Sequence, residues 1–521
     1  VDAKKVDKTA VTSGTAGVTL TYKETQPGVE VHTLVRCHDE THMAFEVGAN
    51  TLNEWRLAYL GDDGSAADAG ELDWAVFWER QPHVLYELAP HPVGWWIATR
   101  YTDTKPQGEV FACDVHASDW PLSFPGDTGA VRPFLRYEPA IPVTDITVYE
   151  RFVTVAVRTN GMPKLLMVTA DAVVAKLRDA AADFPMFTVA DLADAQDVIA
   201  AIGPAFRPRA DDVYGVELLG DSDGFGAPNF RVEVTSPTGP SCEFEISLRD
   251  DAPTDAAGVQ RWAAAFLMEQ PIAVRHTRSD YCAKIVWTTV EESVGPEDVI
   301  ARAIAATPSA TEVRVPSIVL YRKDTFERGK NPIVISTYGS YGDEDALPFR
   351  TEHLSLLDRG VVIAEALVRG GGQLGRAWHH AGRFDARRNS ITDFIACTRS
   401  LCAQGYGDAK RVAAMGGSAG GTVMGGIINL APELYRAVVL QVPFVDCLTT
   451  MLDASRPLTQ GEWDEWGNPV ADAAAYHAIL GYSPLDNLPT PEQVAARGTV
   501  FPHVLVDSAW NDGRVSIQEP A

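Results

Sequence analysis

The sequence lacks the features of several large classes of protein. It has no run of 18 or more apolar residues, so no segment is predicted to span a membrane. Basic residues are scarce: 44 Lys and Arg stand against 70 Asp and Glu, a net charge of −26. Such a charge repels nucleic acid and anionic lipid and attracts cationic ligands, although a solvated acidic surface explains it equally well. Nucleic-acid and membrane partners are therefore not expected.

Cysteine is also scarce and shows no pattern. The seven cysteines are widely spaced, odd in number and without a CxxC, which is typical of free thiols in a reducing compartment. Cys397 and Cys402 fall on one predicted helix and are poorly aligned for a disulfide. No signal peptide is visible. We expect a cytoplasmic protein with no metal and no cofactor.

Short strand-like runs fill the first part of the chain, separated by Gly, Pro, Asn and Asp. Their spacing is typical of a sandwich, barrel or propeller. Segments near 173–202 and at 297–306 are predicted to be helical additions. The predicted strands are 17–22, 29–35, 75–78, 84–88, 95–99, 110–115, 152–159, 165–168, 230–235, 242–248 and 283–289.

The pattern changes near residue 313 to alternating strands and helices, which indicates a mostly parallel, doubly wound sheet. Pro316 predicts an edge position or an irregular start for its strand. We place a β domain at 1–289, a connection and the start of the second domain at 290–330, and an α/β domain at 331–521. The predicted strands are 313–321, 332–337, 361–367, 411–415, 437–442 and 503–506, and the predicted helices 390–403 and 421–428.

The strongest chemical signal is a G-x-S-x-G motif between a strand and a helix, with Ser418 at its centre. A serine on such a turn faces the carboxyl edge of the sheet, and the Ala419 N–H can point at a developing oxyanion. Ser418 is therefore a candidate nucleophile, and a structural glycine turn is the alternative. Asp512, after the last predicted strand, is a candidate acid. No histidine follows it, since His477 and His503 both precede it, so the general base of a triad is missing from this sequence.

Two acidic clusters, at 343–345 and 462–466, follow or contain aromatic residues. We interpret 462–466 as a polar, aromatic loop. Such clusters are usually solvated, but carboxylates beside tryptophans can clamp a guanidinium through hydrogen bonds and cation–π contact.

Residues 332–521 resemble the catalytic domain of the prolyl oligopeptidase family of serine peptidases, in particular oligopeptidase B. Its motifs occur here in order: YGSYG at 338–342, LSLLDRG at 354–360, VRGGGQLG at 368–375, GGSAGG at 416–421, VPFVD at 442–446, TMLD at 450–453, EWGNP at 465–469 and EPA at 519–521. The β part agrees more loosely. The resemblance implies a two-domain fold: a β-propeller, incomplete in this chain, and an α/β-hydrolase domain, C-terminally incomplete.

The resemblance also implies roles. Ser418 matches the nucleophile, Asp512 the triad acid, and Tyr338 the partner of the Ala419 N–H in the oxyanion hole. Glu462 and Asp464 match the acidic pair that binds Arg or Lys at P1. The implied activity is a serine oligopeptidase that cleaves short basic peptides through an acyl-enzyme, as a monomer or homodimer.

Departures from the family pattern leave an alternative open. Ala346 and Pro348 replace acids of a second basic subsite, and the 343–345 cluster is a candidate replacement for those acids. The N-terminal portion is short, and the family's histidine would fall beyond Ala521. The chain is therefore either a fragment of a longer protein or a degenerate paralogue that acts as a binding or scaffold protein. An esterase or acyl transferase of the same fold is a weaker alternative.

Overall fold

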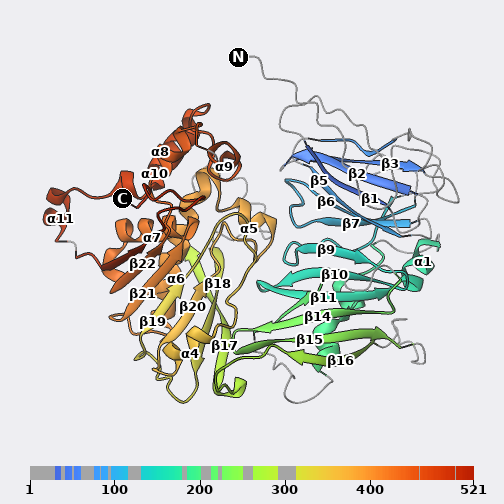
Figure 1. Cartoon of the computed structure of the whole chain (residues 1–521), viewed down its shortest axis with the longest axis horizontal. Coiled ribbons are helices and arrows are strands. Elements are labelled where there is room, and N and C mark those ends of the chain that lie inside the picture. Colours follow the sequence, from blue (N-terminus) through green and yellow to red (C-terminus); the bar gives the residue numbers. More distant parts are fainter. Residues whose placement is uncertain are drawn as a thin grey trace.

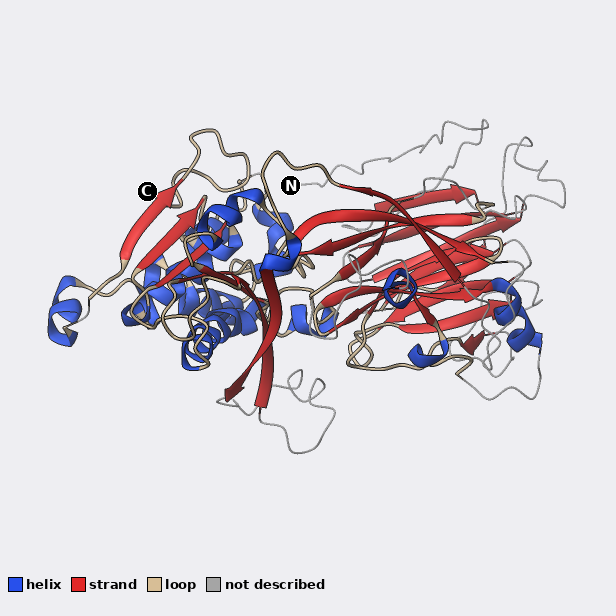
Figure 2. Cartoon of the chain, turned by 90° about the horizontal axis from the view of Figure 1, so that it is seen from below, coloured by secondary structure: helices blue, strands red, loops and turns tan. Residues whose placement is uncertain are grey.

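The computed structural model divides into a domain of antiparallel sheets and a domain built on one large mixed sheet (Figure 1). Most helices gather in the second domain, as Figure 2 shows. The predicted two-domain architecture, a β-propeller part followed by an α/β-hydrolase domain, is confirmed. The structure describes residues 30–36, 42–49, 52–59, 75–81, 84–91, 95–114, 131–178, 185–200, 213–220, 226–249, 262–291, 312–456, 458–498 and 500–520.

The propeller part has four antiparallel sheets of four strands each within the described residues, and the strands of each sheet follow one another in the chain. The first two sheets are β1 (Glu30–Arg36), β2 (His42–Ala49), β3 (Leu52–Tyr59) and β4 (Ala75–Trp78), then β5 (Leu85–His91), β6 (Trp95–Tyr101), β7 (Glu109–Asp114) and β8 (Val131–Pro133). The other two are β9 (Val143–Val148), β10 (Phe152–Thr159), β11 (Met162–Thr169) and β12 (Ala193–Asp194), then β13 (Gly215–Leu218), β14 (Asn229–Ser236), β15 (Gly239–Leu248) and β16 (Trp262–Glu269).

Side-chain alternation explains how these sheets pack. Along β15, buried and half-buried residues alternate from Pro240 to Leu248, so the more buried face packs on a neighbouring sheet. The central strand β6 is instead buried almost throughout, because sheets cover both of its faces. Helices α1 (Ala170–Arg178) and α2 (Ala195–Ala200) occupy the segment predicted to be a helical addition.

The hydrolase domain contains a seven-stranded sheet in the order β17-β18-β20-β19-β21-β22-β23. The strands from β20 to β23 in this order run parallel, and β17 and β18 are antiparallel additions at one end. The strands are β17 (Tyr281–Glu291), β18 (Glu312–Arg322), β19 (Ile333–Ser336), β20 (Val362–Ala366), β21 (Val412–Gly417), β22 (Ala437–Gln441) and β23 (His503–Asp507). The helices are α4 (Thr351–Leu357), α5 (Arg376–His380), α6 (Arg388–Ala403), α7 (Ala419–Leu430), α8 (Cys447–Leu452), α9 (Thr459–Trp466), α10 (Ala473–Tyr482) and α11 (Pro491–Arg497).

The structure differs from the sequence-based expectation at the domain boundary. Strand β17 belongs to the hydrolase sheet, because it pairs with β18 along its whole length, from Tyr281 opposite Arg322 to Glu291 opposite Glu312. The hydrolase sheet therefore starts before the boundary predicted at residue 289. Local strand propensity predicts a strand here but cannot say which sheet it joins, because its partner β18 follows only after a long intervening segment. The predicted strand 17–22 and helix 297–306 lie outside the described residues.

Pro316 does not lie on an edge strand, since β18 is flanked by β17 and β20. Its missing N–H is tolerated because pairing with β20 begins at the next residue, Ser317.

Polar contacts join the two domains. The Gln107 side-chain amide donates to the Leu374 carbonyl at 2.9 Å, and Arg158, buried in the propeller part, bonds to Glu344 at 2.9 Å. Gln107 is buried as well, so these bonds form in a partly desolvated interface. The loops that follow β19 and β20 are therefore both hydrogen-bonded to the propeller domain.

Candidate active site

Ser418 lies on a sharp turn between β21 and α7. Its backbone has φ 51° and ψ −120°, a conformation that non-glycine residues rarely adopt. Two hydrogen bonds hold it: the Ser418 N–H donates to the Gln441 carbonyl at 2.9 Å, and the Phe444 N–H donates to the Ser418 carbonyl at 3.0 Å. The predicted strand–turn–helix setting of Ser418 is therefore present, with the side chain half-buried at the carboxyl end of the sheet.

Two glycines of the motif are required by close backbone approach. A Cβ on Gly416 would lie 2.6 Å from the Gly420 carbonyl oxygen, and a Cβ on Gly420 would lie 2.6 Å from the carbonyl oxygen of Thr337. The turn therefore packs directly on the segment that leads from β19 to Tyr338.

Tyr338 and Ala419, the two predicted oxyanion-hole donors, both line the pocket that holds Ser418. Tyr338 follows β19, which pairs with β21, and its side chain hydrogen-bonds to Ser418. Burial raises the pKa of Tyr338, the bond to Ser418 partly offsets this, and the Asp343 and Glu462 carboxylates raise it further, so the hydroxyl keeps its proton at neutral pH. Ala419 is the first residue of α7, and its N–H has no partner inside the helix.

Asp512 follows the edge strand β23, whose side chains are all exposed. Its carboxylate accepts from the Arg514 N–H at 2.8 Å and from the Val515 N–H at 2.9 Å, and these bonds lower its pKa. The Asp512 side chain is thus ionised and oriented by its own loop.

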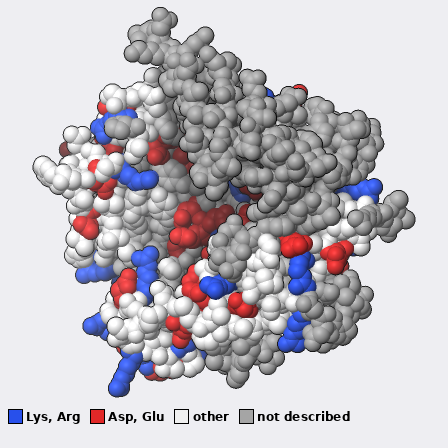
Figure 3. All heavy atoms as spheres, turned by 45° about the vertical axis from the view of Figure 1, so that its right-hand side comes forward, with Lys and Arg blue, Asp and Glu red and all other residues white. Residues whose placement is uncertain are grey.

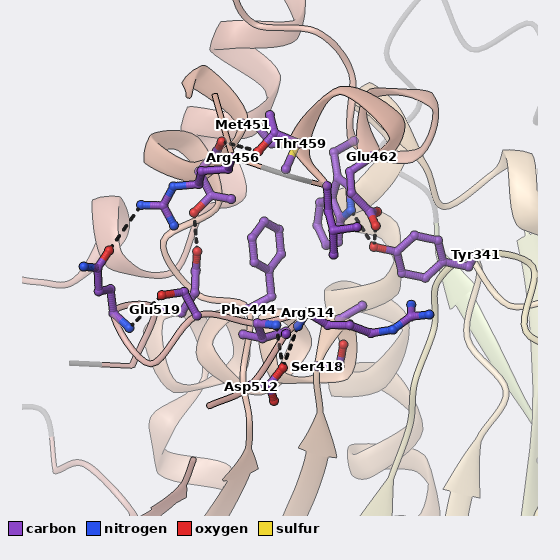
Figure 4. Close-up of a pocket in the computed structure, with 18 of the residues that line it drawn as sticks. Tyr341, Ser418, Phe444, Met451, Arg456, Thr459, Glu462, Asp512, Arg514 and Glu519 are labelled. Carbon is purple, nitrogen blue, oxygen red and sulfur yellow. Dashed lines mark hydrogen bonds between the residues drawn. The ribbon is translucent and has the colours of Figure 1, made fainter. Parts of the chain in front are cut away.

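These residues converge on one pocket of about 960 Å³. The pocket is lined by Ser418, Tyr338, Ala419, Asp512 and Glu462. Figure 4 shows Ser418 and Asp512 in the lower part of the view, and Glu462 and Tyr341 at its upper right. No histidine is among the lining residues that the structure describes.

Glu462 lies in a helix, not in the predicted loop. Helix α9 ends at Trp466 and is followed by Gly467, whose φ is 92°; its residues Glu465 and Trp466 are buried. Because residues two apart point to different sides of a helix, Glu462 lines the pocket while Asp464 is exposed and outside its lining. Binding of a P1 side chain by both acids remains a prediction, and the geometry favours Glu462.

A buried network beneath the pocket was not predicted from the sequence. Glu465 accepts from Arg387 at 2.7 Å and from the Tyr341 N–H at 2.9 Å, and lies 2.7 Å from His379 Nε2. Burial favours a higher pKa for Glu465, but the bond to His379 and the Arg387 charge outweigh it and leave the pKa lowered. The Arg387 guanidinium also lies over the Trp466 ring at 4.0 Å. The EWGNP motif in the sequence contains Glu465, but its role in this network became clear only from the structure, in which α9 buries Glu465.

Acidic side chains dominate the electrostatics around the site. Figure 3 shows Asp and Glu gathered in a hollow of one face of the molecule, with Lys and Arg mainly around its rim. Burial raises the pKa of Glu365 to about 8, and the Asp343 and Asp345 charges raise it further. Burial likewise raises the pKa of Asp343 to about 6, with a further contribution from the Asp345 charge. The 343–345 cluster therefore adjoins the pocket, which Asp343 lines.

Within the described ranges, no helix is both long and apolar enough to cross a membrane. No group of three or more His, Cys, Asp or Glu side chains in the same ranges is placed to hold a metal ion.

Known proteins show similarity over much of the chain. Dipeptidyl aminopeptidase BI from Pseudoxanthomonas mexicana is 37% identical over 325 residues, which are 62% of this chain and 39% of that protein. Protease 2 from Moraxella lacunata is 35% identical over 275 residues, 53% of this chain and 36% of that protein. The chain thus spans less than half the length of these relatives.

Solved structures share the fold. Oligopeptidase B from Leishmania major matches with a TM-score of 0.70 and 24% identity, over 96% of this chain and 59% of that one. Oligopeptidase B from Trypanosoma brucei, in a closed form with covalently bound antipain, matches with a TM-score of 0.70 and 23% identity, over 96% and 60%. The model of the prolyl oligopeptidase family matches residues 348–521, which include the Ser418 turn, α9 and the Asp512 loop. Over residues 348–521, the hydrolase domain of this chain is therefore similar to the prolyl oligopeptidase family.

Proposed function

We propose that this chain carries the active site of a serine oligopeptidase that hydrolyses short peptides on the carboxyl side of Arg or Lys. The observation that carries the proposal is the presence of Ser418 and the Glu462 carboxylate in one pocket. A carboxylate there would bind a guanidinium or ammonium group while the adjacent carbonyl carbon meets Ser418.

In the proposed mechanism the Ser418 hydroxyl attacks the peptide carbonyl, and Tyr338 and the Ala419 N–H donate to the oxyanion. The amine leaves, and water then hydrolyses the acyl-enzyme. A base must accept the Ser418 proton. We assign this step to a histidine outside these 521 residues, oriented by Asp512, since none lines the described pocket. The 521-residue polypeptide alone is then expected to lose about 10⁶ in turnover, as hydrolases that lack this base do.

Fluorophosphonate labelling of the natural full-length protein, read by mass spectrometry, tests the nucleophile. Label on Ser418, absent in Ser418→Ala, supports the proposal, and label on another serine contradicts it. A natural protein that takes no label favours the alternative, an inactive paralogue or fragment that acts as a binding or scaffold protein. The observation that supports this alternative is that no histidine is among the described residues that line the pocket.

The preference for basic side chains needs its own test. Glu462→Gln should weaken transition-state binding of Arg substrates by about 2–5 kcal/mol if the carboxylate is desolvated. Asp464→Asn is the matched variant, on the same helix but outside the pocket lining. Equal kcat/KM of the unmodified enzyme for Arg and Leu substrates would refute the preference.

A further inference from the structure

We propose that Tyr341 is a positioning residue that sets the pocket's affinity for a cation by fixing the Glu462 carboxylate against the 338–342 loop. The proposal rests on the proposed function, because it takes Glu462 as the group that meets the substrate cation.

The Tyr341 hydroxyl makes two hydrogen bonds, one as a donor and one as an acceptor. It donates to Glu462 Oε2 at 2.7 Å and accepts from Trp466 Nε1 at 2.9 Å (Figure 4 shows the first bond). The other Glu462 oxygen accepts no hydrogen bond from the described residues, so it is available to a ligand. A carboxylate already held by one oxygen loses less conformational freedom when a cation binds.

The backbone of Tyr341 is held in an unfavourable conformation. Its φ is 60°, outside the usual range for a residue with a side chain. The Glu465 carboxylate accepts the Tyr341 N–H, and Arg387 donates to the Gly339 carbonyl and the Ser340 hydroxyl. Tyr341 is nevertheless 43% exposed, so core packing does not explain why a tyrosine is placed there. The bond from its hydroxyl to Glu462 does.

Tyr341 also connects the cation site to the oxyanion donor. The rings of Tyr341 and Tyr338 lie 6.2 Å apart on the same loop, and the Glu462 charge raises the pKa of Tyr338. A cation bound at Glu462 would cancel that charge and make the Tyr338 hydroxyl a stronger donor. Recognition of a basic side chain would thus strengthen the group that stabilises the oxyanion.

The test is a double-mutant cycle on the 521-residue chain, with benzamidine as the cationic probe and calorimetric titration as the readout. Tyr341→Phe should weaken binding about tenfold, because a hydrogen bond to a charged group is lost. In a Glu462→Gln background the same change should have no effect, since the group that it positions is no longer charged. Tyr406→Phe is the matched control: it removes a tyrosine hydroxyl that makes no hydrogen bond with the described residues and lies outside the pocket lining.

Each outcome decides the matter. Tenfold weakening of benzamidine binding by Tyr341→Phe that is confined to the chain with Glu462 intact, with unchanged benzamidine affinity in Tyr406→Phe, supports the proposal. No weakening by Tyr341→Phe, or equal weakening in both backgrounds, overturns it and leaves the proposed function intact. Failure of the unmodified chain to bind benzamidine more tightly than Glu462→Gln would overturn both, and is recognised because it does not depend on Tyr341.

Discussion

The two halves of the pocket are built in different ways. Ser418 lies at the end of β21, with β19 and β22 on either side, and its turn packs on the Thr337 carbonyl. Asp512 follows β23 at the edge of the sheet, where Val504, Leu505 and Val506 are 49%, 62% and 45% exposed. The half of the pocket around Ser418, the candidate nucleophile, is therefore positioned by the core, whereas the half around Asp512, the candidate acid, lies at the margin of the domain.

Their hydrogen bonds differ in the same way. The nucleophile half is tied together by bonds between distant segments, such as Arg387 to Glu465, which are 78 residues apart. The carboxylate of Asp512 accepts from N–H groups two and three residues further along. Changes to the nucleophile half should therefore affect the whole domain, and changes to the acid half should stay local. Four measurements test this contrast.

The largest effect is expected from Arg387→Met, which leaves the buried Glu465 carboxylate without its guanidinium partner. Arg387 is 1% exposed, so the free energy of unfolding should fall by about 3–5 kcal/mol. Arg456→Met is the control, because its bond to Asp453 is 3.4 Å long and partly solvated, and should cost less than about 1 kcal/mol. Urea unfolding measures both. Similar losses of unfolding free energy in the two variants would show that the Arg387–Glu465 network does not stabilise the nucleophile half.

A matched pair of glycine substitutions should give the next largest difference. In Gly420→Ala the new Cβ would meet the Thr337 carbonyl oxygen at 2.6 Å, and the backbone must move, at a cost of about 2–3 kcal/mol. A Cβ on Gly513, beside Asp512, meets nothing within 4 Å, so Gly513→Ala should stay within about 0.5 kcal/mol of the unmodified chain. Thermal unfolding of the two variants measures this difference in stability. An equal loss of stability in both variants would contradict the contrast between the two halves of the pocket.

The two halves should respond to pH with opposite signs. The folded-state pKa of Glu365, near the 343–345 cluster, is raised from 4.5 to about 8, so the folded state binds the extra proton and stability falls as the pH rises from about 4.5 to 8. Asp512 has a lowered pKa, so its contribution is present above its unfolded-state pKa and is lost as the pH falls through the folded value.

Glu365→Gln tests the fall in stability with rising pH that is attributed to Glu365, because glutamine is neutral like the protonated acid. The decline in unfolding free energy between pH 5 and 8 should shrink by on the order of 2 kcal/mol. Glu352→Gln, fully exposed on α4, is the control and should leave the decline unchanged. An unchanged decline in Glu365→Gln would mean that the carboxyl is ionised in the folded protein.

The smallest effect should come from Asp512→Ala. Removal of the carboxylate frees the Arg514 and Val515 N–H groups, so their amide hydrogen exchange should accelerate several-fold while the Tm changes little. Asp512→Asn keeps one acceptor oxygen and should show a smaller acceleration. Exchange that also accelerates in β21 would contradict the local character of this half.

Much of the site could be predicted from the sequence where the signal was local. The Ser418 turn could be predicted because an apolar strand, small residues and a helix follow one another within a short segment. The position of Asp512 after a strand could be predicted because the apolar run of that strand directly precedes its loop. The 462–466 segment was misjudged as a loop because its acidic and aromatic residues masked a helical spacing that places Glu465 and Trp466 on the buried side.

The sequence by itself determined the strand and helix periods, the two-domain order and the strained serine turn, because each depends on neighbouring residues. Only the tertiary structure decided that β17 joins the hydrolase sheet, that Glu462 faces the pocket without Asp464, and that Tyr341 holds Glu462. These depend on contacts between residues far apart in the chain, such as the 121 positions between Tyr341 and Glu462. No local period encodes such a contact, because its energy exists only once the core has brought the two segments together.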